Sequence, residues 1–303
     1  MFSLFAGPRA PRAAAALTVA LGTGLALPFI LGGTASAAAP SATAEFSSTD
    51  QAIVYTAAAG QTNDLVVTSS KAQGVDEITY VIDDTVPITA GTDCRHPDPA
   101  DLTTVSCTVA TLETQDPYDT LRMVLGDGDD AVSYTNGTGQ AYYTVTFELG
   151  EGDDTLTESG YPPASRVGGG PGDDLISVGE ASVVRGDDGD DEIRAQAGTL
   201  VFGDAGADVI YSIGDAAQAD GGAGDDEIWG SYDQQHLWGG DDNDVIHGAE
   251  GGDFLYGGRG NDVLYGDGGD DTIYGNTGDD KLYGGAGTDT LSGGAGTNVV
   301  QQD

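Results

Sequence analysis

The pattern of apolar and polar positions along the chain changes near residue 121. Between about Ala42 and Thr120, short apolar runs are separated by Gly, Pro, Asn and Asp. These runs cover residues 52–55, 64–68, 77–82 and 102–109. Such runs are typical of β-strands joined by turns, and no helical period of useful length is present. We therefore expect residues 38–120 to form a small β-rich region that caps the rest of the chain.

From Leu121 onward the apolar positions follow a nine-residue period. The unit is Gly-Gly-x-Gly-x-Asp-x-U-x, where U is a large aliphatic residue, and clear copies are residues 169–177 and 257–265. The sixth-position residues are Asp130, Asp154, Asp174, Asp191, Asp208, Asp226, Asp244, Asp253, Asp262, Asp271, Asp280 and Asp289, with Asn298 in the last copy. In all thirteen copies the residue two positions later is Val, Ile or Leu. A disordered acidic tail has no physical reason to keep this register, so the period predicts a folded repeat array over residues 121–303.

This nonapeptide resembles the RTX, or haemolysin-type, calcium-binding repeat of secreted bacterial proteins. The resemblance covers about residues 121–301. It implies an all-β fold, namely a parallel β-roll in which two nonapeptides complete each coil of the solenoid. It also implies that calcium ions are bound at the turns.

The residues themselves give an independent reason to expect calcium. Neighbouring parallel strands lie about 4.8 Å apart, so Asp residues one coil apart stack at about that spacing. Two oxygens on opposite sides of one calcium ion are about 5 Å apart, which matches. Without an ion, two carboxylates at this distance repel by roughly 0.9 kcal/mol even in water. We therefore predict that the twelve sixth-position Asp residues are metal ligands and that calcium supplies folding free energy.

The spacing of the repeats predicts two unequal rows of carboxylates. Successive sixth positions are 17 to 24 residues apart as far as Asp244 and nine residues apart afterwards. One edge of the roll should therefore carry a continuous ladder from Asp130 to Asn298. The opposite edge should carry only the three Asp residues 253, 271 and 289. With one ion between stacked turns, and doubtful sites at the ends, we expect about six to nine Ca²⁺.

Composition excludes several functional classes. The chain has 49 Gly, and its 50 acidic residues against 10 Lys and Arg give a formal net charge of −40. It has too few basic residues to neutralise nucleic-acid phosphates, and an anionic membrane surface would repel it. It carries neither a His-Glu-x-x-His nor a Gly-x-Ser-x-Gly motif. Since the N-terminal region is also too short for the catalytic domains that often precede such repeats, we expect no enzyme.

Residues 1–37 have the pattern of a secretory signal peptide. Two arginines precede an apolar stretch, and Ala35-Ser36-Ala37 matches the small-x-small pattern of a cleavage site. A single membrane anchor is the alternative, because the apolar stretch has about 20 residues. We expect removal of the signal, no remaining membrane span and an extracellular protein. Cys94 and Cys107, the only cysteines, should then form a disulfide.

The sequence leaves the role of the folded roll open between three interpretations. A structural or adhesive surface protein is the leading one. Position nine carries aromatic residues at 18-residue steps, as at Tyr265 and Tyr283, so a calcium-dependent polysaccharide-binding module is the alternative. Such rows more often only pack against one another on a flat sheet. An extracellular hydrolase is the third interpretation.

Overall fold

The computed structural model describes residues 40–112, 117–140, 143–160 and 164–302. The predicted signal peptide, residues 1–37, lies outside these described residues. All regular secondary structure within them is β-strand, as the sequence predicts. Accordingly, this part of the chain holds no helix long and apolar enough to cross a membrane.

The strands form two long sheets, of 13 and 14 strands. In spatial order, the strands of the first sheet are β26 (Thr290–Ser292), β24 (Thr272–Thr277), β22 (Phe254–Arg259), β20 (His236–Asp241), β18 (Gln218–Ala223), β16 (Leu200–Ala205), β14 (Val183–Asp188), β12 (Ser165–Pro171), β10 (Tyr143–Glu151), β8 (Tyr118–Asp127), β2 (Ala52–Thr56), β1 (Ala42–Ser47) and β5 (Ile88–Ala90). Those of the second sheet are β27 (Val299–Gln301), β25 (Lys281–Tyr283), β23 (Val263–Tyr265), β21 (Val245–His247), β19 (Glu227–Trp229), β17 (Val209–Ser212), β15 (Glu192–Ala195), β13 (Leu175–Ser177), β11 (Thr155–Gly160), β9 (Ala131–Gly137), β3 (Asp64–Ser70), β4 (Glu77–Asp83), β7 (Thr104–Ala110) and β6 (Cys94–Arg95).

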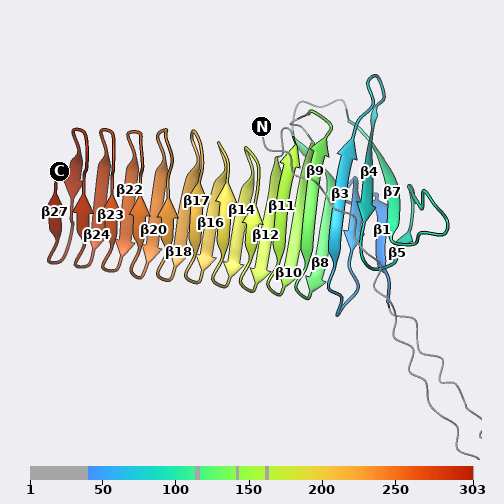
Figure 1. The fold of residues 1–303 in the computed structure, drawn as a ribbon, viewed down its shortest axis with the longest axis horizontal. Coiled ribbons are helices and arrows are strands. Elements are labelled where there is room, and N and C mark those ends of the chain that lie inside the picture. Colours follow the sequence, from blue (N-terminus) through green and yellow to red (C-terminus); the bar gives the residue numbers. More distant parts are fainter. Residues whose placement is uncertain (1–39, 113–116, 141–142, 161–163, 303) are drawn as a thin grey trace, which may run out of the picture. The chain divides into compact units, whose positions relative to one another are not determined.

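From β8 onward, successive strands alternate between the two sheets, and each sheet adds its strands in chain order (Figure 1). All pairings in this part are parallel, and in the regular coils partners lie 18 residues apart, as for Ile228 and Ile246. Each coil therefore contains one strand of each sheet and two turns. This arrangement is the predicted parallel β-roll.

The aliphatic residue of each repeat lies in the core between the sheets. In eleven of the thirteen copies this side chain is at most 2% exposed. The two exceptions are in the last coil, where Leu291 is partly buried and Val300 is 48% exposed. A short strand such as β19 contributes a single buried side chain, Ile228. The hydrophobic stabilisation from that strand is therefore modest, about 1.5–3 kcal/mol.

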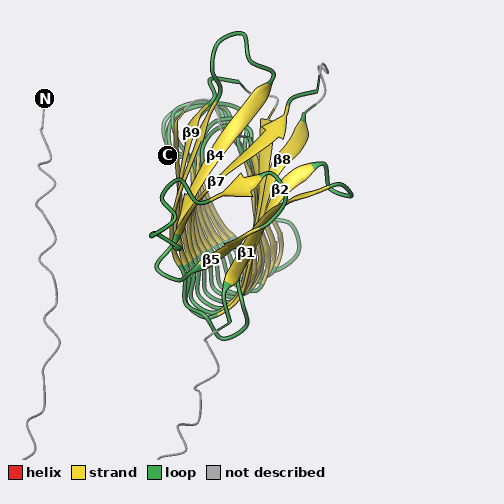
Figure 2. Ribbon diagram, turned by 90° about the vertical axis from the view of Figure 1, so that its right-hand side faces the viewer, coloured by secondary structure: helices red, strands yellow, loops and turns green. Residues whose placement is uncertain are grey.

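The N-terminal strands continue both sheets. The four predicted N-terminal strands are present as β2, β3, β4 and β7. β2 pairs in parallel with β8, and β3 pairs in parallel with β9, so residues 52–70 form a further coil ahead of residue 121. Beyond this coil, β1 pairs antiparallel with β2, and β4 pairs antiparallel with both β3 and β7 (Figure 2). The sheets cross the change in sequence pattern because strand pairing requires inward apolar residues and does not require Gly-Asp turns.

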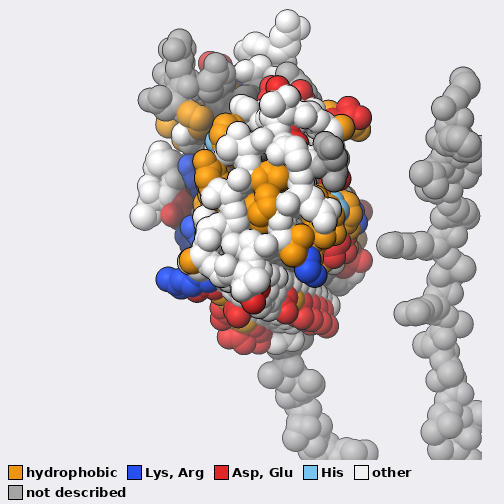
Figure 3. Space-filling model, turned by 90° about the vertical axis from the view of Figure 1, so that its left-hand side faces the viewer, with side chains coloured by type: hydrophobic (Ala, Val, Ile, Leu, Met, Phe, Trp, Pro, Cys, Tyr) orange, Lys and Arg blue, Asp and Glu red, His pale blue; other side chains and the backbone are white. Residues whose placement is uncertain are grey.

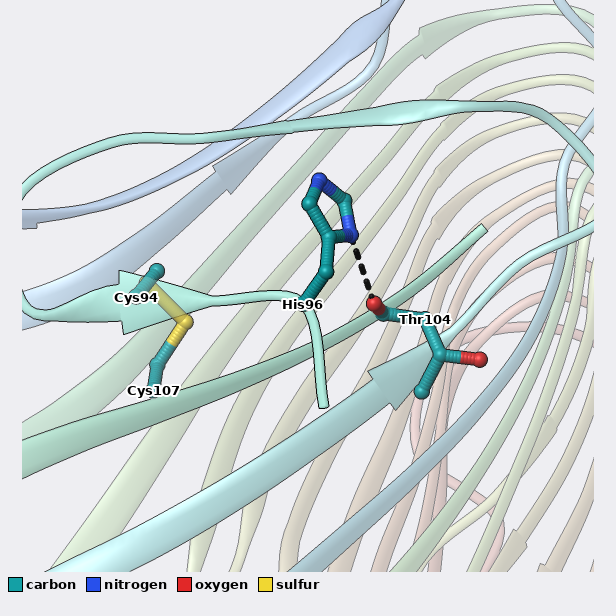
Figure 4. The surroundings of a disulfide bond; sticks show 4 residues. All are labelled: Cys94, His96, Thr104 and Cys107. Atoms are coloured by element: carbon teal, nitrogen blue, oxygen red, sulfur yellow. Dashed lines mark hydrogen bonds between the residues drawn. A yellow bond between two sulfur atoms is a disulfide. The ribbon is translucent and has the colours of Figure 1, made fainter. Parts of the chain in front are cut away.

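The predicted disulfide between Cys94 and Cys107 is present (Figure 4). It joins β6 to β7, which pair antiparallel with these two residues opposite each other. Close by, His96 Nδ1 lies 2.9 Å from the main-chain oxygen of Thr104, a hydrogen bond that ties the loop after β6 to the start of β7. The disulfide closes a short loop, and the chain-entropy model assigns such a cross-link roughly 3 kcal/mol.

Candidate metal centre

Nine of the twelve predicted Asp ligands, together with Asn298, form a hydrogen-bonded ladder along one edge of the roll. In each step a main-chain N–H donates to the Oδ1 atom of the sixth-position residue in the next coil, as from Asp226 to Asp244 at 3.0 Å. The N···O distances along the ladder are 2.6–3.1 Å. Its members, in order, are Asn63, Asp130, Asp154, Asp174, Asp191, Asp208, Asp226, Asp244, Asp262, Asp280 and Asn298. The irregular 24- and 20-residue steps therefore keep the same register as the regular ones.

The opposite edge carries a shorter ladder of Asp253, Asp271 and Asp289. The main-chain N–H of each donates to the next at 2.9 and 3.0 Å, and Gln235 N–H donates to Asp253 at 2.8 Å. In the coils before these, the same register position holds the neutral, buried residues Ser165, Ser182, Thr199, Ala217 and Gln235. This edge is charged only in its C-terminal coils, as the spacing predicts.

Each ladder carboxylate except Asp289, whose Oδ2 accepts a hydrogen bond from the Gln302 side chain at 3.2 Å, has one oxygen without a hydrogen bond. Among the described residues, the buried Oδ2 atoms that lack a partner belong to Asp130, Asp154, Asp174, Asp191, Asp208, Asp226, Asp244, Asp253, Asp262, Asp271 and Asp280. Removing an ionised oxygen from water without a compensating partner costs several kcal/mol, so proteins rarely leave such atoms unpaired. Eleven repeats of the same unpaired atom therefore indicate a place for a cation.

First-position glycines leave open the space into which these oxygens point. A Cβ atom on Gly239 would lie 2.1 Å from Asp244 Oδ2 and 2.6 Å from the main-chain oxygen of Gly257 in the next coil. A Cβ atom on Gly221 would meet Asp226 Oδ2 at 2.1 Å and the main-chain oxygen of Gly239 at 2.7 Å. A carboxylate oxygen and a carbonyl oxygen thus converge in the same small space. Both are oxygen ligands of the kind that Ca²⁺ prefers.

Burial raises the pKa of the ladder carboxyls. Loss of hydration is the largest cause, and the carboxylates of neighbouring coils add to it, so the pKa of Asp226 rises to about 7 and that of Asp244 to about 8. The pKa is raised in all eleven residues with an unpaired Oδ2. A bound divalent cation would reverse this preference, because it stabilises the ionised carboxylate.

A second, exposed row of polar side chains accompanies the buried ladder. Fifth-position residues accept main-chain N–H groups from the following coil, as Asp173 does from Asp190 at 2.9 Å and Asp225 from Asn243 at 2.9 Å. Acidic side chains gather along one edge in the view of Figure 3. Exposed carboxylates beside the turns raise the local concentration of cations.

Sequence reasoning missed two members of these ladders, Asn63 and Gln235. A signal was available, since buried Leu65 and Leu237 follow them by two positions, as the aliphatic residue follows Asp in every repeat. Both residues are neutral. Gln235 Oε1 accepts the main-chain N–H of Ser231 at 2.9 Å, so an amide fills the turn where the later coils have a carboxylate.

No group of three or more His, Cys, Asp or Glu side chains converges on a common point in the described part of the chain. Each turn offers instead one carboxylate together with main-chain carbonyl groups. A donor set made only of oxygen suits Ca²⁺, whereas structural Zn²⁺ sites use mainly Cys and His. The residues present therefore fit calcium.

Comparison with protein families gives one match. The model of the RTX calcium-binding nonapeptide repeat matches in four copies, at residues 218–234, 229–264, 238–273 and 265–300. No curated protein matches the chain. The matched residues include all three Asp residues of the opposite edge, 253, 271 and 289.

Proposed function

We propose that this RTX calcium-binding repeat protein is secreted, that its roll folds on binding extracellular calcium, and that it serves as a structural or adhesive surface protein. The row of buried Oδ2 atoms without hydrogen bonds carries the proposal. The proposed calcium ligands are Asp130, Asp154, Asp174, Asp191, Asp208, Asp226, Asp244, Asp253, Asp262, Asp271, Asp280 and Asp289.

Calcium would act mainly on the free energy of folding. Aliphatic burial in each coil is small, and the stacked carboxylates oppose folding by roughly 0.9 kcal/mol per neighbouring pair even at the dielectric constant of water. An ion between two turns replaces this repulsion by coordination. Extracellular modules bind calcium with dissociation constants of about 10⁻⁴–10⁻³ M, so the roll would fold in millimolar calcium outside the cell and stay loose before export.

We propose about six to nine ions, most of them along the long ladder. Its ten steps set the upper limit there, and the neutral residues Asn63 and Asn298 at its ends weaken the first and last sites. The opposite edge adds at most two ions, between Asp253, Asp271 and Asp289.

Two observations support export. The disulfide between Cys94 and Cys107 is of a kind that persists in oxidising compartments. The N-terminal sequence has the pattern of a signal peptide. RTX repeats are also typical of secreted bacterial proteins, and as calcium-binding structural modules they lead us to propose a role without catalysis.

The aromatic rows favour a structural role over polysaccharide binding. Trp229, His247, Tyr265 and Tyr283 stack ring on ring, with centroids 4.1–5.0 Å apart and planes within 10° of parallel. Each inner ring therefore has both faces covered by its neighbours and offers only its edge to solvent. A sugar stacks on an open ring face, and these inner rings have none, so we rank polysaccharide binding second to a structural role. No observation favours a hydrolase.

Calcium titration of the chelated protein tests the proposal. We expect a weak β signal in circular dichroism with chelator, and a gain of signal with heat release as calcium is added, saturating at about six to nine ions. Magnesium at the same concentration should have a smaller effect, because Mg²⁺ loses its hydration water reluctantly. A strong β signal in chelator, with no heat on adding calcium, would contradict the proposal.

A further inference from the structure

The outward row of side chains on the first sheet is interrupted at one position. Along this row, Arg185, Phe202, Asp220, Trp238 and Tyr256 occupy equivalent positions in successive coils. Arg185 lies over the Phe202 ring, and Trp238 stacks on Tyr256. Between the two aromatic residues, the short Asp220 side chain leaves a hollow whose walls are Phe202 and Trp238.

The width of this hollow, which we call the slot, suits one flat group. Two coil spacings of about 4.8 Å separate its walls by about 9.6 Å, so a group midway would be about 4.8 Å from each ring. The same roll already shows a group stacked at this distance. Arg185 Cζ lies 4.5 Å from the centre of the Phe202 ring, on the side away from Asp220, and Arg194 Cζ lies 4.7 Å from the centre of Tyr211.

The floor of the slot selects for positive charge. The guanidinium of Arg185 stacks on the Phe202 ring and pairs with the Asp204 carboxylate at 2.9 Å, so one cation is already bound by a ring and a carboxylate in this row. On the other side of Phe202, Asp220 offers a second carboxylate, and no described basic residue is paired with it. The strongly acidic chain, with a net charge of −40, further favours a cationic ligand.

We propose that the slot binds the guanidinium group of an arginine side chain on a partner peptide. The group lies between Phe202 and Trp238, making cation–π contacts to both rings, and donates hydrogen bonds to the Asp220 carboxylate. Arginine fits better than lysine because the guanidinium is planar and stacks. The slot goes beyond the calcium function: it is on the face of the sheet and uses none of the proposed calcium ligands.

Tryptophan fluorescence of the calcium-saturated protein tests the slot, in a Trp229→Phe background that leaves Trp238 as the only indole. The probe is acetyl-Gly-Arg-Gly-amide, and its matched control carries citrulline, which has the shape of arginine without the charge. We expect saturable binding of the arginine peptide, at least tenfold weaker binding of the citrulline peptide, and weakening by salt.

Variants of the slot sharpen the test. Asp220→Asn should lower the affinity at least tenfold, and Asp220→Phe should abolish binding by filling the slot with a ring. Asp215→Asn removes the same charge from an exposed position five residues earlier and should leave the affinity unchanged.

Equal binding of the two peptides, no binding at all, or full affinity in Asp220→Asn would overturn the proposal. A response to a neutral oligosaccharide that exceeds the response to the arginine peptide would also overturn it, in favour of a glycan. Each titration uses protein whose β signal in calcium is intact, so failure of the slot is distinguishable from failure of calcium-dependent folding.

Discussion

Replacing Asp226 by Asn should have opposite effects on stability with and without calcium. Asp226 is 2% exposed, its Oδ1 accepts the Asp208 N–H at 2.8 Å, and its Oδ2 has no partner. Asparagine keeps the acceptor, since Asn298 accepts the Asp280 N–H at 2.7 Å in the same position of the ladder. The substitution therefore removes one charge and one proposed ligand oxygen but preserves the ladder bond.

The expected magnitudes depend on the two neighbouring coils. Without calcium at pH 9, above the raised pKa values of all three carboxyls, Asp208 and Asp244 each repel Asp226 by roughly 0.9 kcal/mol, so the variant should be more stable by about 2 kcal/mol. In 10 mM calcium, a site with a dissociation constant near 10⁻⁴ M contributes about 2.7 kcal/mol. Loss of one or two sites, offset by the relieved repulsion, should leave the variant less stable by about 1 to 4 kcal/mol. Each kcal/mol corresponds to about 2–4 °C in the unfolding midpoint.

Thermal unfolding followed by circular dichroism, in chelator and in 10 mM calcium, measures both effects. The matched control is Asp64→Asn, which removes the same charge from an exposed position on β3 outside the ladder. Its two midpoint shifts should be small and of the same sign. A lower midpoint for Asp226→Asn in chelator would refute the argument from charge repulsion. An unchanged midpoint in calcium would show that Asp226 is not a ligand.

Three further outcomes are expected. Gly239→Ala should lower the calorimetric calcium stoichiometry by one or two ions, because its Cβ would lie 2.1 Å from a ladder carboxylate oxygen. The control Gly168→Ala should leave the stoichiometry unchanged, because its Cβ would meet only a side-chain oxygen at 3.2 Å. Replacing Cys94 and Cys107 by Ser should lower the free energy of unfolding in denaturant titrations by about 3 kcal/mol. The calcium stoichiometry should not change, because neither cysteine is a proposed calcium ligand, and a loss of bound ions would contradict this expectation. In chelator the β signal should rise as the pH falls from 8 towards 4, because carboxyls with a folded pKa of about 6 to 8 bind protons that the unfolded chain releases above its pKa of 3.8. A signal independent of pH over this range would contradict the raised pKa values.

The ladder could be predicted from the sequence because its rule is local. Each Asp precedes a buried aliphatic residue by two positions, and the core sets the position of that residue, as for Asp226 and Ile228. The irregular steps at Asp154 and Asp174 do not disturb the ladder, because their extra residues follow the aliphatic positions Val132 and Leu156, where β9 and β11 are longer than the later strands of the same sheet.

The first coil could not be predicted in the same way. The pairing of β2 with β8 joins segments far apart in the chain, and no Gly-Asp turn marks it. The only feature of the repeat that the first coil shares in sequence is the two-residue spacing between Asn63 and Leu65. The slot over Asp220 was equally hidden, since it depends on which outward side chains become neighbours across three coils.

All bonds of the long ladder point the same way along the chain. In every step from Asn63 to Asn298, the main-chain N–H of the earlier coil donates to the side-chain Oδ1 of the ladder residue in the later coil. An ordered coil is thus a template for the next one, and the first coil can start the process because its ladder residue is uncharged. The two largest fully buried side chains, Tyr55 and Tyr80, lie in this N-terminal part, so its hydrophobic core is larger than that of a single later coil. We therefore expect the roll to form from the N-terminal side, with each calcium ion that binds stabilising the newly formed coil.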